Sequence, residues 1–246
     1  MAEPRTISRN DSWQIVTGVA PAWARFFLWM PAIPLLLLAS ALYMLRQRGI
    51  RRDFAICRRV LSERTVVPTH FVELLIISED HRSRWHLGVD PLAIIRVLVK
   101  NCYSRTTGGA STIEQQFVRT VLSRYEKTFA RKLHEQLVAT LLACTISRDL
   151  IAKKYLEIAY FGTGKVGVHS FEKIFGCPLQ NFDMQQVIGV MARLKYPEPR
   201  TPTTKWCVRF DRRCLYIENL VRRRGKFRDI YPEEAAKEVG LVKLTG

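Results

Sequence analysis

Apolar residues form one long uncharged run near the start of the chain. The run covers Phe26–Leu45, and its twenty residues at helical rise would span about 30 Å, the thickness of a bilayer's hydrocarbon core. Trp29 and Tyr43 lie near its two ends, as interfacial aromatic residues often do. Pro31 and Pro34 weaken a helix but are tolerated in membrane spans. The pattern therefore predicts one N-terminal transmembrane helix.

Two other interpretations of this run are a cleaved signal peptide and a buried helix of a soluble protein. A signal peptide could be cut after Ala39-Ser40-Ala41. Such a signal would be long, and the apolar run continues past that site. A buried soluble helix is disfavoured because the run has no polar face. We therefore prefer the membrane anchor.

Shorter apolar stretches with helical spacing follow a basic segment at 46–59. They predict a mainly helical globular part, with no convincing alternating strand pattern. We expect a tail at 1–25, the anchor at 26–45, a basic juxtamembrane linker at 46–64 and one domain at 65–246. The expected helices are Phe71–Glu79, Leu92–Asn101, Thr112–Arg124, Arg131–Thr145, and four more marked by Ser147, by Asp183 with Gln186, by Cys214 with Ile217, and by Pro232. Turns or loops are expected at Arg105–Ala110, Phe161–Gly167 and Lys195–Thr204.

The composition limits the kinds of partner that the protein is expected to bind. The 246 residues are 48% hydrophobic and 25% charged, with a formal net charge of +17. Such a chain folds rather than staying disordered, and its partner is expected to be anionic: nucleic acid, an anionic membrane surface or a phosphate-bearing substrate.

The six cysteines decide little. No C-x-x-C pair occurs, which argues against a zinc site. Cys102 and Cys144 lie in apolar, helical surroundings and are predicted to be small core residues. Cys207 and Cys214 could form a disulfide in an oxidising compartment, but spacing alone does not fix the pairing.

Three stretches carry candidate chemistry, and the first is Ser78–Asp90. Glu79 and Asp80 end an apolar helix, and His86 and Gly88 follow. A carboxylate at this place can act as a general base, because partial desolvation raises its basicity. The alternative is an acidic residue that merely solvates a helix end.

The second and third stretches are Gly109–Thr120 and Arg131–Glu135. The second offers hydroxyl and amide groups for sugar and pyrophosphate oxygens, and Arg119 as a cation for phosphate. In the third, Glu135 shares its helix face with apolar residues, which is unusual for a merely solvating glutamate.

In this order, the three stretches resemble the signature of the peptidoglycan glycosyltransferases. The first is similar to E-D-x-x-F-x-x-H-x-G, the second to G-G-S-T-I-T-Q-Q-L-x-K-N and the third to R-K-x-x-E. A fourth match begins at Ser147-Arg148. The resemblance covers residues 65–240. Departures from the family pattern are Ser83, Glu114, Thr120, Lys153 and Glu157.

The resemblance implies a mainly α, lysozyme-like domain with a small membrane-facing lobe and a cleft. Glu79 would be the base that deprotonates the acceptor 4-hydroxyl, and Glu135 the second catalytic carboxylate. A divalent cation, Mg2+ or Mn2+, is expected to assist. The implied substrate-binding residues are Asp80, His86, Ser111, Thr112, Gln115, Gln116, Arg119, Arg131, Lys132 and Arg148.

The implied function is polymerisation of lipid-linked disaccharide-peptide (lipid II) into β-1,4 glycan strands, by a monofunctional enzyme. Partners would be lipid II, the growing strand, the membrane and a cell-wall synthesis complex. The resemblance places the enzyme in the inner membrane, as a single-pass protein with its catalytic domain outside. The arginines after the predicted span instead favour a cytoplasmic domain under the positive-inside rule, so the two arguments conflict.

Two other functions remain to be weighed. The departures allow a catalytically degenerate homologue that binds lipid-linked precursor or a cell-wall partner without turnover. The positive charge fits a nucleic-acid-binding protein, but no nucleic-acid motif is present and aromatic residues do not interleave with the basic ones. We therefore expect no nucleic-acid partner.

Overall fold

The computed structural model describes residues 32–80, 82–83, 86–91, 93–94 and 111–223, and they form a mainly helical protein. The longer helices are α3 (Ile33–Met44), α4 (Arg48–Leu61), α5 (Thr69–Glu79), α7 (Ile113–Val121), α8 (Phe129–Thr145), α9 (Arg148–Ile158), α11 (Met184–Lys195) and α12 (Thr204–Arg223). Short elements are β1 (Tyr160–Gly162), β2 (Lys165–Val166), η3 (Val168–Phe171), α10 (Glu172–Phe175) and η4 (Leu179–Asn181).

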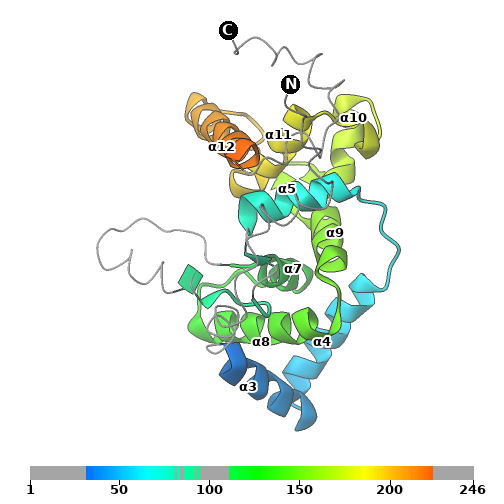
Figure 1. Ribbon diagram of the computed structural model, residues 1–246, viewed down its shortest axis with the longest axis vertical. Coiled ribbons are helices and arrows are strands. Elements are labelled where there is room, and N and C mark those ends of the chain that lie inside the picture. The colour runs from blue at the N-terminus through cyan, green and yellow to red at the C-terminus, as the bar shows by residue number, and fades with distance from the viewer. Residues whose placement is uncertain (1–31, 81, 84–85, 92, 95–110, 224–246) are drawn as a thin grey trace, which may run out of the picture.

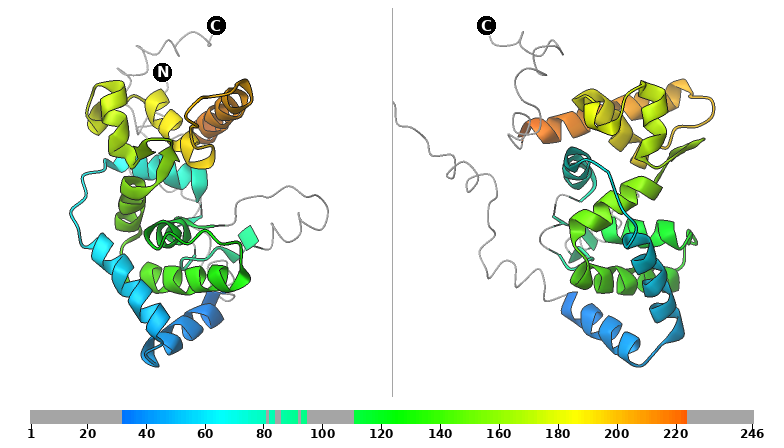
Figure 2. Two further views of the ribbon diagram at one scale, coloured as in Figure 1. Left: turned by 180° about the vertical axis from the view of Figure 1, so that it is seen from behind. Right: turned by 90° about the vertical axis from the view of Figure 1, so that its right-hand side faces the viewer.

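The helices are arranged along one long axis (Figure 1). At one end, α11 packs on α12, with α10 beside them, and at the other end α3 and α4 pack on α8. Helix α5 contacts α11 and α12 on one side and α9 on the other. Helix α7 contacts α8 and α9. Helices α5 and α9 therefore join the two ends of the molecule, as the turned views also show (Figure 2).

One continuous apolar core runs through these contacts. Its largest fully buried aromatic side chains are Phe71 in α5, Phe117 in α7, Phe161 in β1 and Phe171 in η3. Each such side chain removes roughly 150–250 Å² of surface from water. This burial anchors the helices whose ends carry the candidate chemistry.

The predicted anchor is described only in part. Its second half forms α3, which packs against α8 while exposing Leu37, Leu38 and Met44, and its first six residues lie outside the described part. Within the described ranges, no helix combines the length and the apolar character needed to cross a bilayer. Arg46, in the left-handed region with a φ of 57°, separates α3 from α4.

The basic segment after the anchor contains a helix that the sequence interpretation did not assign. In α4, the buried residues Ile50, Phe54, Cys57 and Leu61 recur every three or four positions, which is the spacing of one helix face. The six arginines of the segment obscured this stripe. Its arginines at 51, 52, 58 and 59 lie exposed on the other face.

Two predicted helix starts are confirmed by their caps. The Ser147 hydroxyl accepts a hydrogen bond from Leu150 N, and Asp183 and Gln186 form the reciprocal bonds of a capping box at the start of α11. The Gly-rich segment 161–167 was expected to be a turn. It includes parts of a small antiparallel hairpin, β1 with β2, whose strands are too short to give an alternating pattern.

The structure tests the predictions for three of the cysteines. Cys144 is exposed near the end of α8, so its prediction as a core residue is wrong, because it lies on the face of the helix turned away from the core. Cys207 and Cys214 are free thiols. Both lie on α12 seven positions apart, about 10 Å along a helix, which is too far for a disulfide.

Several predicted features lie outside the described residues. They are the tail 1–25, most of the helix Leu92–Asn101, the turn Arg105–Ala110, the helix opened by Pro232, and Cys102.

Candidate active site

Glu79 is the last residue of α5, at the point where that helix leaves the core. Five apolar side chains of α5 are buried, so the end of the helix is held firmly in place. The Glu79 side chain is 17% exposed. Its Oε1 accepts a hydrogen bond from Arg213 Nη2 of α12 at 2.6 Å, and the two side chains form an ion pair. Burial raises the pKa of Glu79; Arg213 and Lys195 oppose this rise, and Asp80 adds to it. Glu79 is therefore a stronger base than an ordinary surface glutamate.

Glu135 has the opposite environment. Its carboxylate is 3% exposed and receives Arg119 at 3.0 Å, Lys132 at 2.7 Å and Arg131. Burial alone would raise the pKa of Glu135, but the hydrogen bonds and charges of Arg119 and Lys132 outweigh it and hold the pKa below its ordinary value. Three cations around one carboxylate leave an excess of positive charge at this place.

The sequence brings these cations together through two helices. Arg131 and Lys132 lie one turn before Glu135 on α8, where side chains three and four residues apart meet. Arg119 comes from α7, and its Nη2 donates to Ser111 Oγ at 3.0 Å. Lys132 Nζ donates to the same Ser111 oxygen at 3.0 Å. Of the predicted substrate-binding residues, Ser111, Arg119, Arg131 and Lys132 thus form one cluster.

Tyr155 links this cluster to Glu79. Burial raises the pKa of Tyr155, the charge of Glu79 raises it further, and the charge of Arg119 lowers it. The Tyr155 side chain therefore lies within electrostatic range of both groups. Its hydroxyl donates to Gln116 Oε1 at 2.7 Å, which places the predicted residue Gln116 beside the same site.

Sequence reasoning assigned no site role to Tyr155 or Arg213. Tyr155 belongs to the fourth stretch that resembles the family pattern, but that resemblance gave it no role. Arg213 did leave a detectable signal. The buried residues of α12 are Arg213, Ile217 and Val221, so an arginine occupies the apolar stripe of an otherwise ordinary amphipathic helix. A charge in such a position needs a partner.

Other predicted binding residues are buried and already have partners within the protein. Thr112 caps α7, and its hydroxyl donates to Gly88 O at 2.8 Å. Gln115 Nε2 donates to the same oxygen at 3.1 Å, and Gln115 Oε1 accepts from Lys132. Gly88 itself has a φ of +76°, and a Cβ there would lie 2.6 Å from Ala139 O. These contacts seat the glycine turn against α8, so substrate binding by Thr112 and Gln115 stays a prediction.

Asp80 and His86 also make internal contacts. His86 Nε2 lies 3.0 and 3.1 Å from the two oxygens of Asp80. Burial alone would lower the pKa of His86, but Asp80 and Glu114 together raise it. Arg148 donates to His86 O and lies 4.0 Å from Glu114. The predicted binding roles of Asp80, His86 and Arg148 are likewise still predictions.

The predicted divalent cation can be compared with the groups around Glu135. Both oxygens of this carboxylate already accept from cationic side chains. A divalent ion at Glu135 would therefore be repelled by Arg119, Arg131 and Lys132 at close range. These residues fit an anion such as pyrophosphate and do not fit a metal ion held by the protein alone. The expected Mg2+ or Mn2+ stays a prediction.

A comparison with models of known protein families shows to which family this chain belongs. The family model described as transglycosylase matches residues 54–221, more than half of the chain. The chain belongs to the transglycosylase family. The match includes Glu79, Glu135 and Arg213, so the two carboxylates and the arginine of α12 all lie in the transglycosylase domain.

Curated relatives of this transglycosylase are penicillin-binding proteins. Penicillin-binding protein 1B of Vibrio cholerae is 32% identical over 151 residues, 59% of this chain and 19% of that protein. Penicillin-binding protein 1B of Haemophilus influenzae is 26% identical over 182 residues, 72% of this chain and 23% of that protein. Penicillin-binding protein 1A of Aquifex aeolicus is 29% identical over 160 residues, 64% of this chain and 21% of that protein. The chain thus spans about a fifth of the length of these relatives.

Proposed function

We propose that this transglycosylase polymerises lipid II into β-1,4 glycan strands of peptidoglycan. The observation that carries the proposal is the contrast between two carboxylates in one family domain: Glu79 pairs with one arginine, and the buried Glu135 pairs with three cations. The pKa of Glu79 is raised and that of Glu135 is lowered. Titratable groups driven apart in this way mark acid and base assignments in enzymes.

Glu79 takes the proton of the acceptor's 4-hydroxyl. The freed oxygen forms a bond to the anomeric carbon of the donor, and the bond from that carbon to the pyrophosphate oxygen breaks with inversion. The departing lipid pyrophosphate carries the negative charge away. Arg119, Arg131 and Lys132 are partly exposed, at 28%, 16% and 28% of their side chains, and stabilise that charge. Glu135 positions the three cations for this task.

The proposal includes the membrane. A donor with a lipid tail is reached most easily by a protein that sits at the bilayer surface. The exposed apolar residues Leu37, Leu38, Met44 and Leu45 on and after α3, next to the exposed arginines of α4, support such an attachment. We place the protein at the inner membrane, with its catalytic domain on the extracytoplasmic side, in contact with cell-wall synthesis partners.

One observation favours a second function, a homologue that binds lipid-linked precursor without turnover. The carboxylate of Glu79 is already paired with Arg213 at 2.6 Å. If that pair persisted with substrate bound, the proton of the acceptor would have no free base to go to. The same assay separates the two functions.

The test is glycan polymerisation from purified lipid II. Wild type, Glu79→Gln, Glu135→Gln and the surface control Glu63→Gln would be compared for both polymer formation and lipid II binding. Glu63 is exposed just after α4. We expect wild type and Glu63→Gln to polymerise equally. Glu79→Gln should lose about 100-fold or more in rate, the contribution of a positioned base. Glu135→Gln should lose about as much, because the three cations that stabilise the leaving group lose the carboxylate that positions them.

Two results would count against polymerisation as described. Full activity of Glu79→Gln would remove this residue as the base. Binding of lipid II by wild type without any polymer would establish the non-turnover function instead.

A further inference from the structure

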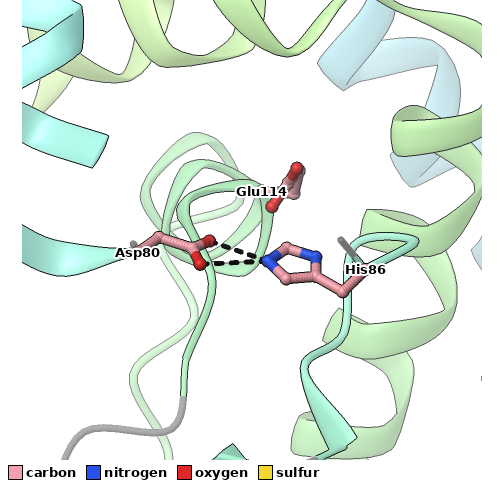
Figure 3. A group of neighbouring side chains, drawn as sticks. All are labelled: Asp80, His86 and Glu114. Carbon is pink, nitrogen blue, oxygen red and sulfur yellow. Dashed lines mark hydrogen bonds and ion pairs between the residues drawn. The ribbon is translucent and has the colours of Figure 1, made fainter. Parts of the chain in front are cut away.

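Three side chains from different parts of the chain converge beside Glu79. Asp80 follows α5, His86 lies in the loop after it, and Glu114 is in the first turn of α7. One ligand-type atom from each lies within 4.8 Å of the others, and all three residues are buried. Figure 3 shows the Asp80 and Glu114 carboxylates next to the same edge of the His86 ring. This group is separate from the cations around Glu135.

Glu114, like the Nδ1 atom of His86, has unmet hydrogen-bonding capacity within the described residues. It is 2% exposed, and its Oε2 has no hydrogen-bond partner among the described residues. Its other oxygen lies 4.0 Å from Arg148 Nε, too far for a hydrogen bond. Burial is the main reason that the pKa of Glu114 is raised. A buried carboxylate oxygen without a partner carries a large desolvation cost.

The other two members are held in a fixed arrangement. Asp80 Oδ2 accepts from Ile113 N at 3.2 Å, which orients the carboxylate toward His86. His86 Nε2 faces Asp80, and Arg148 holds the backbone oxygen of His86. A spacing of 3.0 to 3.1 Å between the Asp80 oxygens and His86 Nε2 is close to the spacing of two atoms that share a tetrahedral metal ion, about 3.3 Å for bonds of about 2.0 Å.

We propose that Asp80, His86 and Glu114 form a binding site for a divalent transition-metal ion of the Zn2+ or Mn2+ class. One imidazole nitrogen and two carboxylate oxygens suit such ions. The two carboxylates would supply the charge that neutralises a divalent cation next to a neutral imidazole. The cysteine pattern argued against a zinc site, but these ligands involve no thiol.

Other cations fit less well. Ca2+ takes six to eight oxygen ligands, and Mg2+ usually keeps several waters. The described cluster offers two carboxylates and a nitrogen, in a place with little exposure to solvent. A proton shared between His86 Nε2 and Asp80 would still leave both His86 Nδ1 and Glu114 Oε2 without a partner among the described residues.

The site has a structural consequence that does not depend on the proposed reaction. An ion at this place would join the end of α5, the loop through His86 and the start of α7. Since Asp80 directly follows Glu79, the ion would hold the backbone that carries Glu79. It would act as a positioning group and would not touch the substrate.

The test is metal binding by the full chain after chelator treatment. Thiols would first be blocked, since free cysteines also bind these metals. Titration calorimetry with Zn2+ and with Mn2+ should show one site per chain for at least one of the two ions. Glu114→Gln keeps the shape of the side chain but removes its charge, and we expect it to weaken affinity by about 100-fold or more. Glu63→Gln, an identical change at an exposed position, should bind as wild type does.

A second measurement on wild type guards against a variant that fails to fold. Co2+ bound to the thiol-blocked chain should give visible d–d absorption that saturates at one equivalent and disappears when Zn2+ is added. Absence of stoichiometric binding for Zn2+, Mn2+ and Co2+ would overturn the proposal. Unchanged affinity in a folded Glu114→Gln variant would overturn it as well. Neither result depends on polymerisation, so the site and the proposed function fail separately.

Discussion

The groups around the two oxygens of a carboxylate decide how readily it takes up a proton. Glu79 and Glu135 differ in this respect within one domain. Glu79 has one arginine at 2.6 Å and is otherwise desolvated. Glu135 is more deeply buried but has three cationic partners. The same residue type is therefore a base in one place and a permanent anion in the other.

Arg213 gives a prediction at this scale. Arg213→Met fills similar space but removes the charge that pairs with Glu79, so a nearly buried carboxylate loses its partner. We expect a loss of about 3 kcal/mol in the free energy of unfolding, measured by urea denaturation. The matched control is Arg222→Met on the same helix, whose pair with Glu218 is exposed, and its expected loss is below about 1 kcal/mol. Equal losses for the two variants would show that Arg213 contributes no more than a surface pair.

Sequence reasoning reached the two glutamates and the three cations around Glu135, but not Arg213, the partner of Glu79. Glu79, Glu135 and Arg119 follow from local motifs. The contact between Glu79 and Arg213 joins positions 134 residues apart, and no local pattern encodes it. In the sequence, Glu114 stood out only as a departure from the family pattern. It lies with Asp80 and His86 (Figure 3), because the first turn of α7 directs it inward.

At the scale of elements, helix caps were the most reliable sequence feature. The least reliable was an apolar helix face interrupted by many charged residues. Helix α11 begins where Asp183 and Gln186 predicted. Helix α4 was missed although Ile50, Phe54, Cys57 and Leu61 mark its buried face. The hairpin β1–β2 was missed because strands of three and two residues are too short for a periodic signal.

The α11 capping box provides the prediction for this scale. Asp183→Ala removes the acceptor for Gln186 N, and we expect it to lower the free energy of unfolding by about 1 kcal/mol. Gln185→Ala, at an exposed position of the same turn, should change it by less than about 0.5 kcal/mol. Thermal unfolding of both variants under one buffer condition provides the comparison. A larger effect of Gln185→Ala than of Asp183→Ala would contradict the role of the cap.

At the scale of the whole molecule, apolar and basic surface lie next to each other at one end. Helix α3 exposes leucines, and α4 beside it exposes arginines. The opposite end, formed by α10, α11 and α12, is far from this surface (Figures 1 and 2). The formal net charge of +17 adds a general attraction to anionic surfaces.

Binding to vesicles tests this surface. The chain should bind vesicles that contain anionic lipid, and the affinity should fall as salt rises. Leu37 is 64% exposed, and Leu37→Glu should weaken binding about tenfold or more, because insertion of a leucine contributes roughly 1.5–3 kcal/mol. Val166 is 61% exposed on the hairpin, and Val166→Glu should have little effect. Equal losses for both variants would indicate a general charge effect and no specific contact through α3.

The partner of Glu79 also has a consequence for the order of events during synthesis. Arg213 leaves the ribosome 134 residues after Glu79, which at about 5–20 residues per second is a delay of roughly 7–27 s. Throughout that interval α5 can form, but its terminal carboxylate stays hydrated and ordinary. The altered basicity of Glu79 therefore arises only after α12 has been synthesised and has docked against α5.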